Sequence, residues 1–117
     1  MSKSAKNVLV VDDHPAFRAS ARRLLESEGY CVVGEAGDGA SALTAVAELA
    51  PDLVLLDVQL PDIDGFEVAE RLNGATDVVL ISSRDRTDFG PLLDTAAVLG
   101  FISKGELTGE ALSELLR

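Results

Sequence analysis

The sequence has little cysteine and no long hydrophobic run. Cys31 is the single cysteine among 117 residues, so no disulfide can form within the chain, as is usual in the reducing cytoplasm. We interpret Cys31 as a small apolar strand residue. No apolar run approaches the roughly 18 residues that a membrane span needs, and residues 1–7 do not lead into a signal-peptide core. We therefore expect a cytoplasmic protein with no membrane partner.

Basic residues are half as numerous as acidic ones. Ten Lys and Arg stand against 20 Asp and Glu, and the formal net charge at pH 7 is −10. This charge repels phosphodiester backbones, so we expect no direct binding of nucleic acid. Hydrophobic residues make up 47% of the chain, which is typical of a folded domain. The length suits one domain, 1–117, and we expect no effector or DNA-binding domain in this chain.

Unbroken apolar runs predict a parallel sheet. Three runs of strand length are apolar throughout, at residues 8–11, 53–56 and 78–81. Strands that are covered on both faces have this pattern. We expect two weaker strands at residues 30–36 and 100–103.

Segments with helical spacing follow each of these strands. The first helix should begin near Pro15 and end at Gly29. The weaker fourth helix, around residues 91–98, should be kept short by Gly90 and Pro91. In the second helix we expect one apolar face, formed by Leu43, Val46, Ala47 and Ala50. Five strand–helix units predict a doubly wound α/β domain, with helices on both faces of a five-stranded parallel sheet.

Acidic residues stand at the ends of two predicted strands. Asp12 and Asp13 follow the first apolar run directly, and Asp57 follows the third. Ligands of doubly wound sheets bind beyond the carboxyl ends of the strands, so the three carboxylates converge if these strands are neighbours. Such a group of charges requires a cation, and oxygen ligands favour Mg²⁺ over zinc. We therefore predict a Mg²⁺ site.

Two other kinds of binding site fit the sequence less well. The first strand runs into an acidic segment rather than a glycine loop, which argues against a dinucleotide site. Residues 62–65 lack the ligand spacing of a calcium EF-hand, and we interpret them as a turn and helix start. His14 precedes a proline at a helix start, and we interpret it as a solvent-facing loop residue without a role.

A hydroxyl and an ammonium group stand at two further strand ends. Ser82 follows the fourth apolar run and Lys104 follows the fifth strand. Beside a metal-bound carboxylate, these two groups can hold the oxygens of a phosphoryl group, by a hydrogen bond and by charge.

In these motifs the sequence resembles the receiver domain of bacterial two-component response regulators, and most of all the receivers of LuxR-type regulators. The resemblance covers essentially the whole chain. It rests on Val-Val-Asp-Asp-His-Pro at 10–15, on the segment from Leu53 to Gly65 around Asp57, and on Gly-Phe-Ile-Ser-Lys at 100–104. It implies a flavodoxin-like fold with strand order 2-1-3-4-5, here as an apparently stand-alone receiver.

The resemblance also implies a phosphoryl switch that is not an enzyme with a separate substrate. Asp57 would accept the phosphoryl group from a sensor histidine kinase or a small phosphodonor. Mg²⁺ would be held by Asp13, Asp57 and the backbone carbonyl of Gln59, with Asp12 acting through water. Lys104 would pair first with Asp57 and then with the phosphoryl oxygens.

The output of such a switch is a change of surface. Ser82 would move toward the phosphoryl group and let Phe101 turn inward, which would alter the face of the fourth helix, fifth strand and fifth helix. This face would serve an unknown protein partner or a phosphorylation-dependent homodimer, the chain being otherwise a monomer.

Several residues depart from the usual receiver pattern or could adjust it. Gly105 stands where the family often has proline after its lysine, so the lysine loop could be looser. Gln59 and Arg84 lie two residues beyond Asp57 and Ser82, where they would influence the lifetime of the phosphoryl group. We also expect the fourth helix to be short or mobile.

Two alternatives to the phosphoryl switch remain. One is a small Mg²⁺-dependent phosphatase or phosphotransferase with an aspartyl intermediate, although the second Asp typical of dehalogenase-type phosphatases is replaced by Gln59. The other is a degenerate receiver that acts only as an interaction module.

Overall fold

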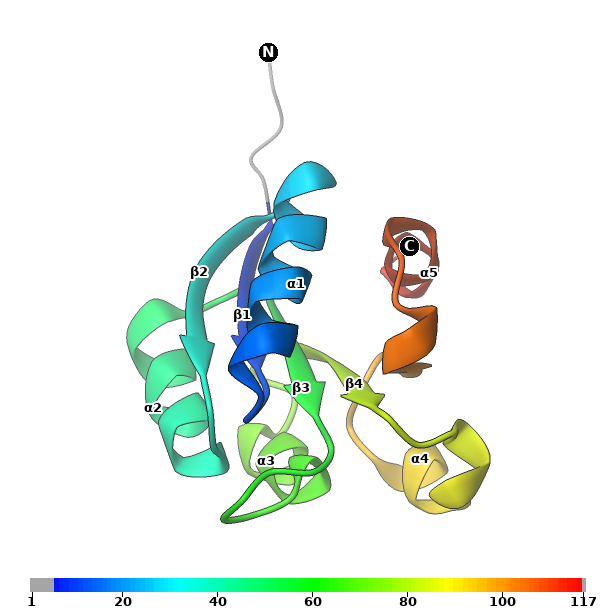
Figure 1. Ribbon diagram of the computed structural model, residues 1–117. Helices are drawn as coiled ribbons and strands as arrows, with labels where there is room; N and C mark the ends of the chain where they lie inside the picture. The colour runs from blue at the N-terminus through cyan, green and yellow to red at the C-terminus, as the bar shows by residue number, and fades with distance from the viewer. Residues whose placement is uncertain (1–5, 117) are drawn as a thin grey trace.

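Five parallel strands form a single sheet in the computed structural model, which describes residues 6–116. The strands are β1 (Asn7–Val11), β2 (Cys31–Ala36), β3 (Leu53–Asp57), β4 (Asp77–Ser82) and β5 (Gly100–Ser103). They pair in the order β2-β1-β3-β4-β5, and every neighbouring pair is parallel (Figure 1). The predicted sheet and strand order are therefore confirmed. We predicted that the chain start does not lead into a signal peptide. This prediction concerns mainly residues 1–5, which lie outside the described residues.

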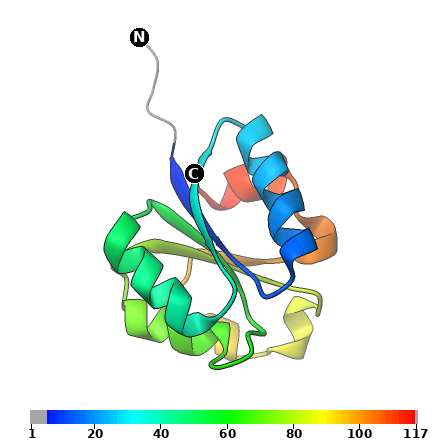
Figure 2. The same ribbon diagram turned by 60° about the vertical axis from the view of Figure 1, so that its left-hand side comes forward.

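Helices cover both faces of the sheet. On one face lie α1 (Pro15–Ser27) and α5 (Gly109–Leu115); on the other lie α2 (Gly39–Leu49), α3 (Gly65–Leu72) and α4 (Leu92–Thr95) (Figure 2). Alternate strand residues point to opposite faces, so Val10 packs in the first layer and Leu9 in the second. Within residues 6–116, no helix combines the length and apolar character that crossing a membrane requires.

Local signals determine where the helices begin and end. Pro15 occupies the first turn of α1, and Gly29 follows its end with a φ of +93°, a conformation that glycine adopts readily. The Asp64 side chain accepts a hydrogen bond from the backbone N–H of Glu67 at 2.9 Å and so caps α3. The predicted turn and helix start at residues 62–65 is therefore confirmed.

Two sequence expectations about packing are wrong in detail. Ala47 and Ala50 are exposed, and the residues of α2 that pack on the sheet are Ala42, Leu43, Ala45 and Val46. Apolar residues occur almost all round this helix, so its sequence does not single out one face. Cys31 is exposed as well, because it begins β2, the strand at the edge of the sheet.

The fourth helix is shorter than the segment predicted for it. α4 spans four residues, Leu92–Thr95, and a 3-10 helix at Arg86–Asp88 precedes it. Between the two, Gly90 has a φ of +53° and breaks the helical path. The expected shortness is confirmed, while the mobility of this segment stays a prediction. Leu92, the first residue of α4, is 54% exposed.

Candidate phosphoryl and metal site

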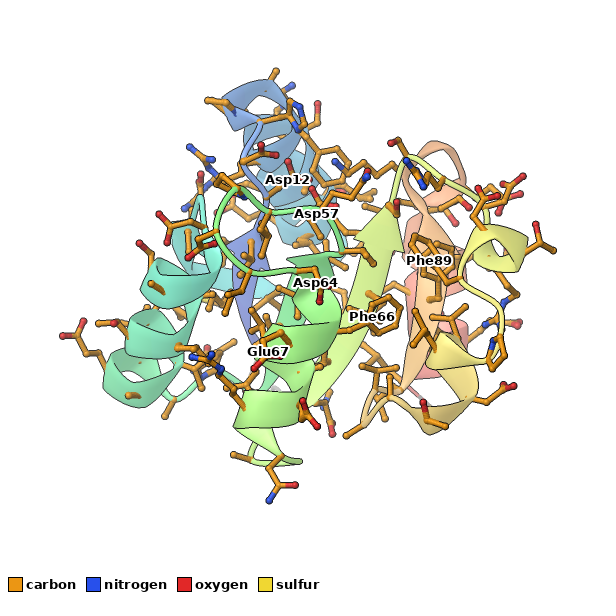
Figure 3. All side chains as sticks on the ribbon, turned by 90° about the horizontal axis from the view of Figure 1, so that it is seen from below. Asp12, Asp57, Asp64, Phe66, Glu67 and Phe89 are labelled. Carbon is orange, nitrogen blue, oxygen red and sulfur yellow. The ribbon has the colours of Figure 1, made fainter. Side chains whose placement is uncertain are left out.

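Three strand ends bring Asp12, Asp57 and Lys104 together at the carboxyl edge of the sheet. Asp12 follows β1 and Asp57 ends the adjacent β3, and Figure 3 shows the two side by side. Lys104 Nζ lies 2.6 Å from Asp12 Oδ2 and 3.4 Å from Asp57 Oδ2. The lysine therefore contacts both carboxylates and lies nearer to Asp12. Gly105, in place of the usual proline, does not turn the lysine away from the site.

Burial dominates the electrostatics of this cluster. Asp12 is fully buried and Asp57 is 2% exposed. Burial is the main reason that the pKa of Asp57 rises from 3.8 to about 6. The backbone N–H of Gln59, 3.1 Å from Asp57 Oδ1, lowers this pKa; the charge of Asp12 raises it and that of Lys104 lowers it. A single ammonium thus serves two buried carboxylates, which leaves negative charge in excess.

The acidic residues fit a hard divalent cation. One ligand atom from each of Asp12, Asp13, His14 and Asp57 lies within 4.8 Å of the others. Asp12 Oδ2 is buried and accepts no regular hydrogen bond from residues 6–116, although Lys104 Nζ is close to it. Carboxylate oxygens are the ligands that Mg²⁺ prefers. The cluster could therefore bind a metal, as predicted, and ligation by the Gln59 carbonyl stays a prediction.

His14 is closer to the acidic site than the sequence analysis expected. Its side chain is 69% exposed, in agreement with a solvent-facing residue, yet Nδ1 lies 3.1 Å from Asp12 Oδ1 and 3.0 Å from Asp13 Oδ1. Its backbone N–H also donates to Asp12 Oδ1 at 2.8 Å. The direct succession Asp-Asp-His was the signal that could have shown this contact.

Helix α1 supplies two further contacts that the sequence analysis missed. The ring of Phe17 lies beneath the lysine, with Lys104 Nζ 4.6 Å from the ring centroid. Arg18 Nη1 donates to the backbone carbonyl of Asp12 at 2.6 Å. Both residues look like ordinary helix positions in the sequence, so only the packing of α1 on the sheet identifies them.

The two predicted switch residues are both buried. Ser82 ends β4, and its Oγ accepts a hydrogen bond from the backbone N–H of Arg84 at 3.0 Å. Phe101 is 8% exposed and packs against Phe89, with 5.5 Å between the ring centroids. Phe101 therefore already points inward without a phosphoryl group, whereas the sequence predicts that it turns inward only on phosphorylation. Gln59 and Arg84 are exposed residues near the carboxyl edge of the sheet.

The fold and this site together define a doubly wound α/β domain with an acidic pocket at the carboxyl ends of its strands. Residues 8–116 match the model of the response regulator receiver domain, and the chain belongs to this family.

Individual relatives agree with this assignment. A Pseudomonas aeruginosa protein named as a transcriptional regulator is 44% identical over 112 residues, which cover 93% of this chain and 52% of the relative. The chain spans about half the length of the curated relatives it matches.

Two solved structures show the same likeness. The receiver domain of NarL from Mycobacterium tuberculosis is 34% identical, with a TM-score of 0.83 and coverage of 97% of this chain and 98% of that one. A LuxR-family response regulator from Aurantimonas is 30% identical, with a TM-score of 0.83 and coverage of 97% and 86%. The predicted similarity to receivers of LuxR-type regulators is therefore confirmed.

Proposed function

We propose that the chain accepts a phosphoryl group on Asp57 and thereby acts as the switch of a two-component system. Receiver domains of response regulators interact with sensor kinases, which would supply the phosphoryl group. The observation that supports this proposal is the placement of Asp57, which is 2% exposed beside Asp12 and within reach of the Lys104 ammonium. A carboxylate in this setting meets the three needs of phosphoryl transfer: a nucleophile, a counter-charge and a place for a cation.

The transfer is a displacement at phosphorus. One oxygen of the ionised Asp57 carboxylate bonds to phosphorus, while the P–N bond of a phosphohistidine or the P–O bond of acetyl phosphate breaks. The histidine or acetate leaves with the electron pair of the broken bond. Water later attacks the phosphorus, which releases inorganic phosphate and restores Asp57. The chain modifies itself in this scheme and does not turn over a separate substrate.

The residues around Asp57 each have a distinct role in the proposal. Lys104 shifts from the two carboxylates to the phosphoryl oxygens, and the Ser82 hydroxyl donates to one of them. Mg²⁺ would be held by Asp13, Asp57 and the Gln59 backbone carbonyl, with Asp12 acting through water, and when bound it would neutralise charge on the transferring group.

The proposed output is the face formed by α4, β5 and α5. Phe101 of β5 is already buried against Phe89. Phosphorylation would therefore hold this inward arrangement through Ser82, rather than bring the ring in from solvent. The stabilised face would bind a partner protein or a second copy of the chain.

Acetyl phosphate and Mg²⁺ test the acceptor role directly. We expect mass spectrometry to detect one added phosphoryl group on the wild type and none on Asp57→Asn. Mg²⁺ alone should stabilise the wild type by roughly 2.7 kcal/mol at a hundred times its dissociation constant, and stabilise the variant much less. Equal behaviour of the two proteins would contradict the proposal and favour a receiver that serves only as an interaction module.

Arg84 is the residue that we expect to lengthen the lifetime of the acyl phosphate. Its cationic side chain, two residues beyond Ser82, would partly screen the phosphoryl group from attacking water. Arg84→Ala should then lose phosphate roughly two- to fivefold faster in a single-turnover assay. Arg86→Ala is the matched control, because Arg86 is also exposed in the neighbouring 3-10 helix. An unchanged rate in Arg84→Ala would disprove this role.

A further inference from the structure

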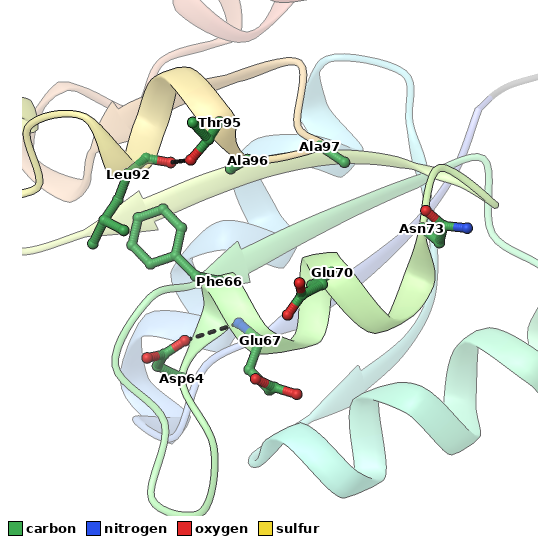
Figure 4. Close-up of a pocket in the computed structure, with 9 residues that line it drawn as sticks. All are labelled: Asp64, Phe66, Glu67, Glu70, Asn73, Leu92, Thr95, Ala96 and Ala97. Atoms are coloured by element: carbon green, nitrogen blue, oxygen red, sulfur yellow. Dashed lines mark hydrogen bonds between the residues drawn. The ribbon is translucent and has the colours of Figure 1, made fainter.

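A groove lies between α3 and α4 and belongs to neither the acidic pocket nor the switch residues. It has a volume of about 430 Å³, and Figure 4 shows Phe66 of α3 and Leu92 of α4 at one end of it. Helix α4, which forms one wall of the groove, has only four residues. Leu92 is 54% exposed at the groove, so its apolar side chain is accessible to a partner.

Three carboxylates line this groove from α3 and the residue that caps it. Asp64, Glu67 and Glu70 follow one another at intervals of three residues, so they lie along one side of the helix (Figure 4). Arg71 pairs with Glu67 at 2.9 Å, whereas Glu70 forms no ion pair within residues 6–116. No basic residue of the described chain lines the groove. A groove with apolar side chains at one end therefore carries an excess of negative charge.

The apolar side of the groove continues into the aromatic cluster around Phe101. The rings of Phe66 and Phe89 contact edge to face with 5.6 Å between centroids, and Phe89 in turn packs on Phe101 at 5.5 Å. Phe66 thus lines the groove on one side and rests on packed rings on the other. Such a supported apolar surface is well suited to receive a side chain from a partner.

We propose that the α3–α4 groove binds a basic, amphipathic helical segment of a partner protein. An apolar side chain of the segment packs on Phe66 and Leu92, and its Lys or Arg residues lie beside Asp64 and Glu70. The volume of about 430 Å³ holds one or two large side chains, as in the helix-in-groove mode of recognition. The net charge of −10 attracts a cationic segment and disfavours an acidic one.

The proposal is tested on the whole unphosphorylated chain, so its outcome is independent of the acceptor role of Asp57. The probe is a synthetic helical peptide of Leu, Ala and Lys, with Leu on one face and Lys on its flanks. We expect saturable changes in the amide NMR spectrum, confined to α3 and to residues 92–97. A peptide with Glu in place of every Lys should cause none.

Two charge reversals separate the groove from the general acidity of the surface. Glu70→Lys lies at the groove, and Glu48→Lys lies on the exposed side of α2 with the same change in net charge. We expect Glu70→Lys to weaken peptide binding roughly five- to tenfold, and Glu48→Lys less than about twofold. The exposed Leu92 supplies a third variant, Leu92→Ser, which should also weaken binding without unfolding the protein.

Three results would overturn the proposal. Equal weakening by Glu70→Lys and Glu48→Lys would reduce the binding to nonspecific attraction. Peptide-induced changes centred on the carboxyl edge of the sheet would place the peptide elsewhere. Changes in α3 and α4 that appear on concentrating the chain without peptide would show that a second copy occupies the groove.

Discussion

The buried acidic pocket and the outer surface of α1 and β2 both hold carboxylates beside cations, yet burial dominates in only one of them. In the pocket, Lys104 is shared by Asp12 and Asp57, and burial raises the pKa of Asp57 to about 6. Charge compensation is incomplete there because one ammonium faces two carboxylates, and the exclusion of water makes the remaining charge costly. The pocket therefore stores an unfavourable interaction that protonation or a metal ion can relieve.

The surface cluster has the opposite balance. Glu35 of β2 accepts from Arg18 Nε at 3.0 Å and from Arg22 Nε at 2.8 Å. The hydrogen bond from Arg22 is the main cause that lowers the pKa of Glu35; burial opposes it and Arg18 adds to it. Two guanidinium groups for one carboxylate, close to water, make the ionised form the favoured one. Carboxylates and cations thus form a site with uncompensated charge or a structural contact, according to burial and charge ratio.

Removing the pocket lysine should have the largest effect on stability. Lys104→Met leaves two buried carboxylates without their cation, so we expect a loss of about 3 kcal/mol in the free energy of unfolding at neutral pH without Mg²⁺. Urea denaturation measures this loss. Lys6→Met is the control, because it removes the same charge from an exposed position and should change stability little. Equal losses in the two variants would show that the pocket stores no special electrostatic energy.

The pH dependence of stability should come next in size. Because the pKa of Asp57 is higher in the folded chain than its ordinary 3.8, the folded state binds more protons between pH 3.8 and about 6. The contribution of Asp57 to stability therefore falls as pH rises through this window, on the order of 1 kcal/mol without Mg²⁺. Asp57→Asn should flatten the curve of unfolding free energy against pH. Parallel curves for the two proteins would contradict the assigned cause.

The surface cluster should give the smallest effect on stability. Its pH dependence should have the opposite sign to that of Asp57. Glu35→Gln should cost about 0.5 kcal/mol at neutral pH in urea denaturation, and the cost should shrink in high salt. The pKa of Glu35 is depressed below 4.5, so its contribution is present at neutral pH and is lost as pH falls through the folded value. A cost that grows with salt would remove the contrast between the two clusters.

Much of the fold was predictable because its signals are local. The apolar runs at 8–11, 53–56 and 78–81 became β1, β3 and β4 with small changes at their ends. Acids that follow such runs must lie at the carboxyl edge, and this placed Asp12 and Asp57 correctly. The buried face of α2 was predicted only in part: Leu43 and Val46 lie on it, but Ala47 and Ala50 do not, since they resemble Ala42 and Ala45 in sequence and differ only in what lies opposite them.

The site was less predictable wherever a contact joins distant segments. The pairing of Lys104 with Asp12, the ring of Phe17 beneath that lysine and the hydrogen bond from Arg18 all depend on how α1 and β5 pack on the sheet. The α3–α4 groove likewise depends on how two separate helices lie against each other, with Phe66 resting on the ring of Phe89. No pattern of residue spacing in the sequence predicts these contacts or the groove.

The amino-acid order alone determined the alternation of strands and helices, the edge at which the carboxylates stand and the acidic character of the surface, since each depends on neighbours in the chain or on composition. Tertiary packing alone decided which carboxylate the lysine approaches most closely, how far burial raises the pKa of Asp57 and where an apolar groove stays open. These properties depend on the distances between atoms from separate segments and on the exclusion of water, and both exist only once the sheet and its helices have assembled.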